Sequence, residues 1–333
     1  MKSFNVFGIG NALVDAEFEV TDDFLKHENI QKGLMTLVDG EAQRVLYDRL
    51  VAKFGLKKRA GGGSAANSMY AISQFGGSAY YTCKVASDEP GDFYVQQLGD
   101  HNIKTNLGQG RAYGDTGKCL VMVSPDAERT MLTFLGISAE ISSSDLDIEA
   151  LKRSQYLYLE GYLSASPSGK IACVDARKAA QANGVAVALS LSDVSMVQFC
   201  RGGLEEMIGD GIDLIFANEG EAKAWTGKDS IPEAMNELKK ISKQIVLTLG
   251  SKGALVFDGN KNISIDSFPT KAIDTNGAGD MFAGAFLYAI TNGKDVATAG
   301  RLASYAASRT VSHFGPRLPP AAHHEILQKV LMP

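Results

Sequence analysis

The chain has 333 residues, of which 45% are hydrophobic and 21% charged, and its formal net charge is −5. This composition allows a large buried core and argues against disorder, and the acidic balance without a basic stripe excludes a typical nucleic-acid-binding protein. The length fits one large α/β domain with an additional piece.

The sequence shows neither a signal peptide nor an apolar run of ~18 residues that could cross a membrane. The first apolar run, 4–9, is short and is broken by Gly10-Asn11. The four cysteines are far apart and form no CxxC pair: Cys83, Cys119, Cys173 and Cys200. We therefore expect a cytoplasmic protein with four reduced thiols and with neither a membrane nor a nucleic acid as partner.

The N-terminal part of the chain mixes strand-like and helical patterns. Strands are predicted at 4–8, 17–20, 34–38 and 80–85, and helices at 41–54, 65–75 and 92–101. Two further strand-like runs, 118–123 and 129–135, are joined by Ser-Pro-Asp-Ala-Glu, which predicts a β-hairpin.

From residue 156 onwards, strands and helices alternate regularly. The predicted strands are 156–159, 185–189, 214–217, 245–249 and 254–258, and the helices are 168–183, 219–226, 231–240, 279–291, 296–312 and 320–331. Such alternation predicts an α/β fold with a doubly wound, mostly parallel sheet and helices on both faces.

Two β-rich segments, 16–40 and 106–138, fall outside this alternation. We expect them to pair as a small β-sheet that forms a lid over the C-terminal edge of the larger sheet. Residues 1–15, 41–105 and 139–333 would then form the α/β core that carries the ATP and catalytic sites.

The sharpest local signal is Asp274-Thr275-Asn276-Gly277-Ala278-Gly279-Asp280, which leads into a helix. Gly277 and Gly279 allow the backbone to approach a ligand closely, and the unpaired N–H groups of the helix start favour a phosphate. A phosphate at this position would repel the carboxylate of Asp280, so the carboxylate is expected to have a function there. Accepting a proton from an attacking hydroxyl is such a function. The alternative is that Asp280 merely caps the helix.

Two more glycine-rich segments precede this motif. Gly61-Gly62-Gly63-Ser64-Ala65-Ala66-Asn67 opens a helix, where Asn67 can donate to and accept from sugar hydroxyls; a flexible loop with an ordinary cap is the alternative. The segment 8–15 begins like a dinucleotide fingerprint, but Leu13 replaces its third glycine and no helical pattern follows. Asp15 could instead bind two hydroxyls of a sugar.

The segment Asn218-Glu219-Gly220-Glu221 follows a predicted strand and starts a helix. Ligands bind at this edge of open α/β sheets, and Glu221 could hold Mg²⁺ through water; simple helix-terminal charges explain it equally well. The turn at 248–253 is a weaker glycine site, and the absence of GxxxxGK[ST] excludes a P-loop kinase.

In combination, these motifs resemble the ribokinase-like (PfkB) family of sugar and nucleoside kinases over essentially the whole chain. Residues 62–67 are similar to the N-terminal signature of that family and residues 274–280 to its C-terminal signature, while 218–221 is similar to its NxxE motif. The turn at 248–253 matches the nucleotide-contacting turn of the family.

This resemblance implies an ATP-dependent phosphotransferase with Asp280 as the catalytic base. It implies an anion hole at Asn276, Gly277, Ala278 and Gly279, and acceptor contacts at Asn11, Asp15, Gly62, Gly63 and Asn67. ATP contacts would come from Asn218, Thr248, Gly250 and Gly253, and Glu221 would hold Mg²⁺ through water. Family members often bind a monovalent cation such as K⁺, here beside 274–275 and 308–315.

Within the family, the segments 10–15, 126–131 and 160–163 look most like the adenosine-kinase branch, in which the lid supplies apolar walls for a base. The resemblance places Leu37, Leu135, Ile137 and Tyr162 in those walls, whereas Met35 departs from the polar residue expected in animal adenosine kinases. The leading hypothesis is a nucleoside kinase for adenosine, acting as a monomer or homodimer. The alternatives are a kinase for a free sugar such as ribose or fructose, and a non-catalytic sugar- or nucleotide-binding regulator, against which the intact Asp280 and glycine loop argue.

Overall fold

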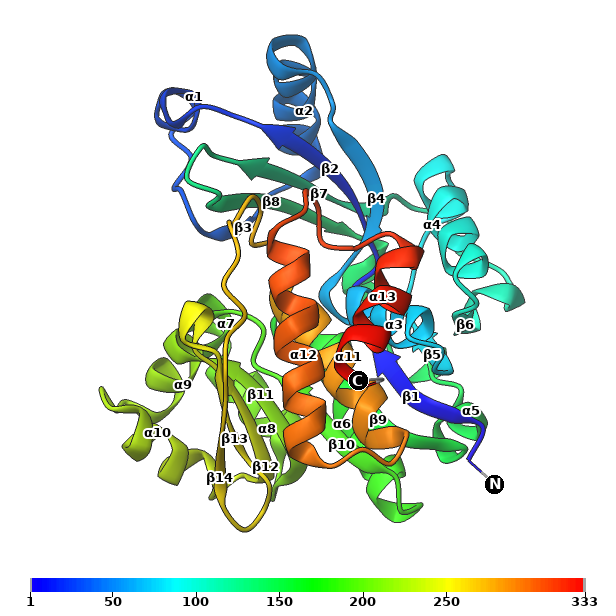
Figure 1. Ribbon diagram of the computed structural model, residues 1–333. Helices are drawn as coiled ribbons and strands as arrows, with labels where there is room; N and C mark the ends of the chain where they lie inside the picture. Colours follow the sequence, from blue (N-terminus) through cyan, green and yellow to red (C-terminus); the bar gives the residue numbers. More distant parts are fainter. Residues whose placement is uncertain (1, 332–333) are drawn as a thin grey trace.

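Two β-sheets organise the computed structural model, which describes residues 2–331 (Figure 1). The larger sheet has nine strands in the order β14-β13-β12-β11-β10-β9-β1-β5-β6. All its neighbouring pairs are parallel except β12/β13 and β13/β14. Its strands are β1 (Phe4–Ile9), β5 (Ala79–Thr82), β6 (Lys104–Thr105), β9 (Ser154–Glu160), β10 (Ala186–Ser190), β11 (Ile212–Asn218), β12 (Ser242–Thr248), β13 (Ala254–Phe257) and β14 (Asn262–Ile265).

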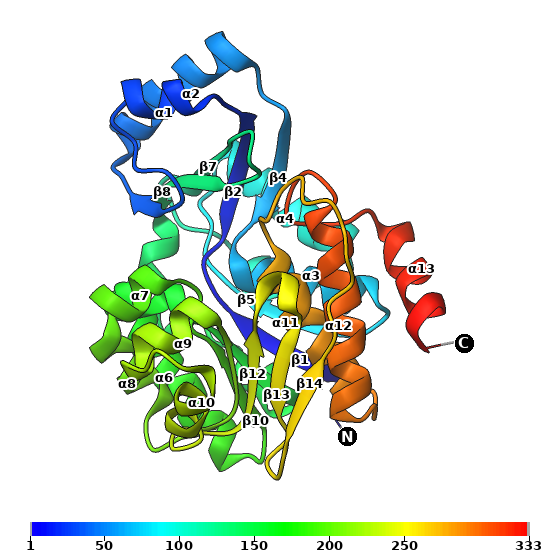
Figure 2. The same ribbon diagram turned by 60° about the vertical axis from the view of Figure 1, so that its left-hand side comes forward.

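Helices cover both faces of this sheet (Figures 1 and 2). One face packs against α3 (Ser64–Gln74), α4 (Glu89–Asp100), α11 (Ala278–Thr291), α12 (Val296–Val311) and α13 (Pro320–Leu331). The other packs against α5 (Ile148–Lys152), α6 (Pro167–Ala182), α7 (Val194–Phe199), α8 (Arg201–Ile208), α9 (Glu219–Thr226) and α10 (Ile231–Leu238). Successive residues of β1 serve opposite faces, Val6 the first and Phe7 the second, both fully buried. Burial on both faces explains why these strands are nearly continuous apolar runs, and the fold is the predicted doubly wound one.

The smaller sheet has five strands in the order β3-β8-β7-β2-β4 and lies beyond one end of the larger sheet (Figure 2). Phe18 and Leu120 from this sheet pack with Leu46 and Leu50 of a covering helix in a separate core cluster. The elements of this part are β2 (Leu13–Glu19), β3 (Met35–Leu37), β4 (Lys58–Gly62), β7 (Thr116–Val123), β8 (Arg129–Gly136), α1 (Asp22–His27) and α2 (Gly40–Phe54).

The smaller sheet uses more of the chain than the two segments predicted for it. Residues 41–62, expected in the core, supply α2 and the edge strand β4, and β2 begins at Leu13. The sequence of β4, Lys-Arg-Ala-Gly-Gly, is poor in residues with high β-propensity. It is a strand because it pairs antiparallel with β2, from Leu13 opposite Gly62 to Glu17 opposite Lys58. That pairing is a long-range contact that a local pattern does not report.

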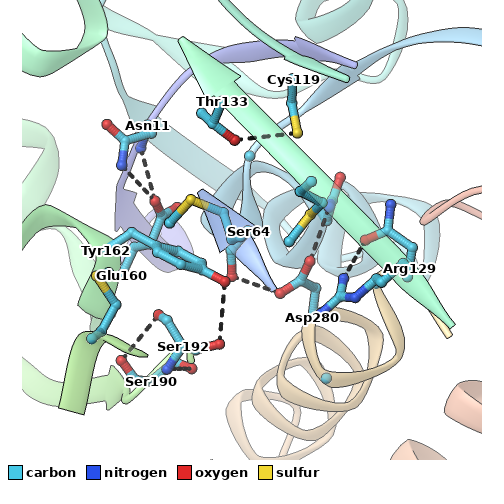
Figure 3. Close-up of a pocket in the computed structure, with 18 of the residues that line it drawn as sticks. Asn11, Ser64, Cys119, Arg129, Thr133, Glu160, Tyr162, Ser190, Ser192 and Asp280 are labelled. Atoms are coloured by element: carbon cyan, nitrogen blue, oxygen red, sulfur yellow. Dashed lines mark hydrogen bonds between the residues drawn. The ribbon is translucent and has the colours of Figure 1, made fainter. Parts of the chain in front are cut away.

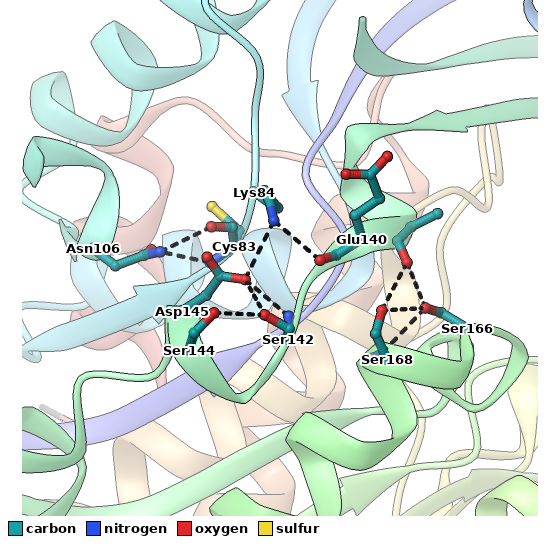
Figure 4. Close-up of polar contacts among 11 residues, drawn as sticks. Cys83, Lys84, Asn106, Glu140, Ser142, Ser144, Asp145, Ser166 and Ser168 are labelled. Carbon is teal, nitrogen blue, oxygen red and sulfur yellow. Dashed lines mark hydrogen bonds and ion pairs between the residues drawn. The ribbon is translucent and has the colours of Figure 1, made fainter. Parts of the chain in front are cut away.

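Polar contacts hold the segment that connects the smaller sheet to β9, residues 137–153, against the larger body (Figure 4). Lys84 Nζ donates to the Glu140 carbonyl at 3.1 Å and lies 3.7 Å from an Asp145 carboxylate oxygen. Ser166 Oγ donates to the Ala139 carbonyl at 2.6 Å. Because these partners belong to the larger body, the end of the smaller sheet is anchored to it. Short 3₁₀ helices complete the chain at Asn106–Gln109, Ile137–Glu140, Ser143–Asp145, Gly161–Ala165 and Gly250–Lys252. Between residues 2 and 331, no helix combines the length and apolar character needed to span a membrane.

Candidate active site

A cavity of about 380 Å³ lies between the two sheets, where β9, β10, β11 and β12 end (Figure 3). The larger body contributes Glu160, Ser190 and Asn218 from strand ends, and the smaller sheet contributes Asp15 and Arg129. We call this space the first cavity. The residues predicted for the site that line it are Asn11, Asp15, Leu37, Gly63, Asn67, Leu135, Tyr162, Asn218, Glu221, Thr248, Asn276, Gly277, Gly279 and Asp280.

Asp280 sits in the first turn of α11 at the wall of the first cavity. Ser64 Oγ donates to its Oδ1 at 2.6 Å, and Asn67 Nδ2 donates to its Oδ2 at 2.9 Å. Burial raises the pKa of Asp280, while the hydrogen bonds from Ser64 and Asn67 and the charges of Arg129 and Arg317 oppose the rise. A carboxylate that is oriented by two donors and has a raised pKa suits proton acceptance.

The loop before α11 is shaped by glycine and by one buried carboxylate. Gly277 is the N-cap with a φ of +73°, and a Cβ there would lie 2.5 Å from the Pro316 carbonyl oxygen, so a side chain does not fit. Asp274 is fully buried, and its two oxygens accept from the N–H groups of Asn276 and Gly315, both at 2.8 Å. These two hydrogen bonds and the close approach of Pro316 hold the loop in this conformation.

These contacts modify the predicted anion hole. The N–H of Asn276 already donates to Asp274, so Asn276 does not offer it to an anion. The N–H groups of Gly279 and Asp280 lie in the first turn of α11, before the helix can pair them internally. The Asn276 side chain meets the smaller sheet instead, because its Oδ1 accepts from the guanidinium of Arg129 on β8. The groups here that could receive an anion are therefore the free N–H groups at the start of α11 and the guanidinium of Arg129.

One side of the first cavity is organised by Glu160, the last residue of β9, which is 1% exposed. Its carboxylate accepts from the Asn11 backbone N–H at 3.2 Å, from Asn11 Nδ2 at 2.9 Å and from the Ala65 N–H at 2.8 Å. Glu160 therefore fixes the link between β1 and β2 and the start of α3. Gly63, with a φ of +96°, passes so close to Asn11 that a Cβ would lie 2.0 Å from its carbonyl oxygen.

Gly62 does not line the first cavity but makes room for a residue that does. A Cβ at Gly62 would lie about 2.1 Å from the Asp15 carboxylate. Burial raises the pKa of Asp15 to about 7, opposed by Arg317 and reinforced by Asp280. Burial also raises the pKa of Glu160 to about 7, opposed by its backbone hydrogen bonds. The first cavity thus places several carboxyl groups where a polyhydroxy ligand could bind them.

One wall of the first cavity comes from alternate residues of β8: Arg129, Met131, Thr133 and Leu135. This two-residue period does not extend to Ile137, which was predicted for the same wall. The strand ends at Gly136, whose φ of +52° turns the chain into a 3₁₀ helix. Ile137 is 4% exposed, packs beside Gly114 and is not among the described residues that line the cavity.

Glu221 and Asn218 form a reciprocal capping box at the start of α9. The Asn218 N–H donates to Glu221 Oε2 at 3.0 Å, and the Glu221 N–H donates to Asn218 Oδ1 at 2.8 Å. Burial raises the pKa of Glu221 to about 7. Between residues 2 and 331, no three histidine, cysteine, aspartate or glutamate side chains cluster closely enough to hold a metal ion. A Mg²⁺ ion beside Glu221 would therefore take most of its ligands from water and phosphate.

A second cavity of about 480 Å³ adjoins the first, and Thr248, Thr275, Gly279 and Phe282 line both. Of the predicted site residues, Gly250, Gly253 and Ala278 line only the second cavity, whose other walls come from 267–272 and 304–311. Two joined cavities that meet at the start of a helix can hold two substrates with a phosphate between them.

Several residues of the site were not assigned a role from the sequence. Arg129, Glu160 and Asp274 each have a hydrogen-bond partner more than 30 residues away, and local motifs do not show such contacts. Ser64 stands inside the glycine-rich segment at 61–67, and its position at the start of a helix was a signal that could have identified it.

Comparisons with known proteins point to one family. The family model described as pfkB family carbohydrate kinase matches residues 34–322. Among solved structures, a probable sugar kinase from Rhizobium etli is similar with a TM-score of 0.94 at 30% identity, covering 100% of both chains. The adenosine kinase of Sinorhizobium meliloti has a TM-score of 0.90 at 30% identity, covering 98% of this chain and 99% of that one. The adenosine kinase of Saccharomyces cerevisiae is 25% identical over 331 residues, covering 93% of this chain and 96% of its own. The chain is therefore a kinase that belongs to the pfkB family of carbohydrate kinases.

Proposed function

We propose that this kinase transfers the γ-phosphoryl group of ATP to the 5′-hydroxyl of a nucleoside, most of all adenosine, with Asp280 as the base. The observation that carries the proposal is the position of the Asp280 carboxylate. It is held by Ser64 and Asn67 at the start of α11, where the first cavity meets the second.

In this mechanism the acceptor lies in the first cavity and ATP in the second. Asp280 takes the proton of the acceptor hydroxyl as its oxygen attacks the γ-phosphorus, and the bond to the leaving ADP oxygen breaks. The N–H groups at the start of α11 and the guanidinium of Arg129 would stabilise the charge on the transferred group.

Mg²⁺ would neutralise the phosphates between the two cavities, with Glu221 holding it through water. Glu221 suits this role because it lines the first cavity while its cap with Asn218 keeps the carboxylate in place. We also propose that K⁺ binds beside the segments 274–275 and 308–315. These segments lie together, because the Gly315 N–H donates to an Asp274 carboxylate oxygen. Lys58 Nζ already donates to the neighbouring Phe314 carbonyl oxygen at 3.4 Å, so K⁺ would need other oxygen ligands there.

The walls of the first cavity favour a nucleoside over a free sugar. On the side of the smaller sheet, the apolar Leu13, Met35, Leu37, Met131 and Leu135 line the cavity beside Asp15, Arg129 and Thr133, and these apolar side chains suit a flat nucleobase. Asp15, together with Asn11 and Asn67, suits ribose hydroxyls. These polar groups alone would serve ribose or fructose, so a sugar kinase is the second candidate.

We also propose that the smaller sheet is a lid. Phosphoryl transfer to a hydroxyl competes with transfer to water, so a cover over the acceptor protects the reaction. Arg129 on β8 supports this role, because its hydrogen bond to Asn276 joins the smaller sheet directly to the loop before α11.

A phosphotransfer assay with ATP, Mg²⁺ and a panel of nucleosides and sugars tests the proposal. We expect the highest kcat/KM for adenosine, and a kcat lower by about 10²–10⁴-fold or more for the Asp280→Asn variant. Good turnover of ribose or fructose without adenosine turnover would favour the sugar kinase. No turnover of any acceptor, alongside binding of nucleoside and ATP, would favour a regulator. Replacing KCl with a tetramethylammonium salt in the same assay tests the role of K⁺.

A further inference from the structure

Arg317 lies directly behind the first cavity, between the loop after α12 and the start of α13. It is 8% exposed and is not among the described residues that line the cavity. Its Nε donates to Asn67 Oδ1 at 2.8 Å, and its guanidinium lies over the Tyr70 ring at 5.1 Å from the centroid. Both partners belong to α3, so Arg317 contacts one face of that helix.

Arg317 decides which way the Asn67 amide faces. A guanidinium has only donors, so the atom of Asn67 beside Nε must be the oxygen. The amide nitrogen is then turned to the other side, where it donates to Asp280 Oδ2 at 2.9 Å. With the amide reversed, its oxygen would face the Asp280 carboxylate and its NH₂ would face the guanidinium. Both contacts would then be repulsive.

The backbone before Arg317 is attached to the loop that leads into α11. The Gly315 N–H donates to Asp274 Oδ2, and Asp274 Oδ1 accepts from Asn276. Pro316 packs against Gly277 so closely that a Cβ on that glycine would lie 2.5 Å from the proline carbonyl oxygen. The segment 315–317 therefore contacts the loop on one side and Asn67 on the other.

We infer that Arg317 is a positioning residue for the phosphoryl transfer, which it serves by orienting the Asn67 amide and, through that amide, the Asp280 carboxylate. The inference rests on the proposed function for its kinetic consequences. Arg317 does not touch the reacting atoms; it sets the direction of a hydrogen bond to the base and adds a positive charge behind it. That charge opposes the burial that raises the pKa of Asp280 and of Asp15.

Three variants separate orientation from charge. Arg317→Met removes both, Arg317→Gln keeps a donor for Asn67 Oδ1 without the charge, and Arg317→Lys keeps the charge without the planar fork. Because small misplacements of a catalytic group are costly, we expect Arg317→Met to lower kcat about tenfold or more. Its KM for ATP should stay near the wild-type value. The acidic limb of the kcat–pH profile should move to higher pH in Arg317→Met and Arg317→Gln but not in Arg317→Lys, and Arg317→Gln should keep most of kcat at high pH. The exposed Arg301→Met is the matched control.

Two further measurements make the result decisive. In an Asn67→Leu background, Arg317→Met should change kcat less than about twofold, because coupled residues are non-additive. A full loss in that background, or an unchanged kcat and pH profile with only a lower Tm, would overturn the inference. If Arg317→Met does not fold by circular dichroism, the Gln and Lys variants carry the test.

The second measurement is ¹³C-carboxyl NMR of Asp280 in the substrate-free protein, with the resonance assigned by its loss in Asp280→Asn. Its titration midpoint should rise in Arg317→Gln, and an unchanged midpoint would overturn the inference. This readout needs no turnover, so a protein inactive with every acceptor would refute the proposed function alone.

Discussion

The two cavities differ in where their walls come from. The first is lined by both sheets and contains buried carboxyl groups with raised pKa values, among them Asp15, Glu160 and Glu221. The second is lined entirely by residues 248–311, and none of its described lining residues carries a charge. Under the proposed function, recognition of the acceptor would therefore depend on the smaller sheet, whereas the second cavity would bind ATP mainly by shape and backbone contacts.

The largest expected effect is at the junction of the two cavities. Asp280→Asn keeps the shape of the side chain but removes the base, so kcat should fall by about 10²–10⁴-fold or more. Binding of ATP, measured by calorimetry, should be largely retained. Asp229→Asn, an exposed change of the same kind, is the control. A variant with near-wild-type kcat would contradict the assignment of Asp280.

The next change tests the wall that the smaller sheet contributes. Leu135→Asp places a carboxylate beside the expected position of the adenine ring. Desolvating that carboxylate costs a few kcal/mol, so the KM for adenosine should rise by roughly 10–100-fold. The KM for ATP should change little. Ile137→Asp is the matched variant two residues away, and because Ile137 is buried outside the cavity, it should lower Tm instead. Equal rises in the adenosine KM for both variants would contradict this description of the wall.

The second cavity is tested by filling it. Ala307 is one of its lining residues, and a phenylalanine there should overfill the space at a cost of about 1–3 kcal/mol. The KM for ATP should rise about tenfold or more, while calorimetric binding of adenosine should stay close to that of the wild type. A loss of adenosine binding as large as the loss of ATP binding would show that the two cavities are not separate.

A smaller effect is expected at the capping box beside the first cavity. Glu221→Gln keeps a side chain that can accept from the Asn218 N–H but loses the charge. We therefore expect a several-fold higher Mg²⁺ concentration for half-maximal activity and a smaller change in the acceptor KM. Glu219→Gln, in the same helical turn and paired with Lys223, is the control. An unchanged Mg²⁺ titration would leave Glu221 with the capping role alone.

The last effect is on stability and not on catalysis, and it concerns Glu17 of β2. Glu17 is fully buried on β2, and neither carboxylate oxygen has a hydrogen-bond partner in the part of the chain that the structure describes. Burial raises its pKa to about 8, opposed mainly by Lys58. The folded state therefore binds a proton that the unfolded state has released. Unfolding free energy should fall between pH 4.5 and pH 8, by up to about 1.4 kcal/mol per pH unit.

Glu17→Gln should remove this slope and be more stable than the wild type at pH 8, measured by urea unfolding across pH. Glu19→Gln, on the same strand but exposed, should keep the wild-type slope. Parallel slopes for the wild type and Glu17→Gln would contradict the assignment.

The strand–helix alternation was enough to predict the larger sheet except for its two edge strands, β6 and β14, because buried parallel strands and amphipathic helices leave patterns in the sequence. The strand β4 and the helices α7 and α8 were not predicted. The strand β4 consists of Lys, Arg, Ala and two Gly residues, which have low β-propensity, so its sequence does not indicate the pairing with β2. The wall position of Ile137 was wrong because the two-residue period of β8 stops at Gly136.

The glycine loop and Asp280 could be recognised because their chemistry is contiguous in the sequence. The partners that orient them could not, since Arg129, Glu160 and Arg317 reach the site from distant parts of the chain. A hydrogen bond such as that between Arg317 and Asn67, 250 positions apart, leaves no local trace.

The position of β1 has a consequence for how the chain folds. β1 precedes the other described strands in the chain, yet in the larger sheet it pairs with β5 on one side and with β9 on the other, where Phe4 stands opposite Ser154. The smaller sheet is interleaved in the same way, because β2 pairs with β7 about a hundred residues later. The smaller sheet cannot be completed before Gly136 of β8 has been synthesised, and the larger sheet not before Ile265 of β14. Slow folding and exposed strand edges during synthesis follow from such non-local pairing, and a fragment that ends before β9 would leave β1 with an open edge.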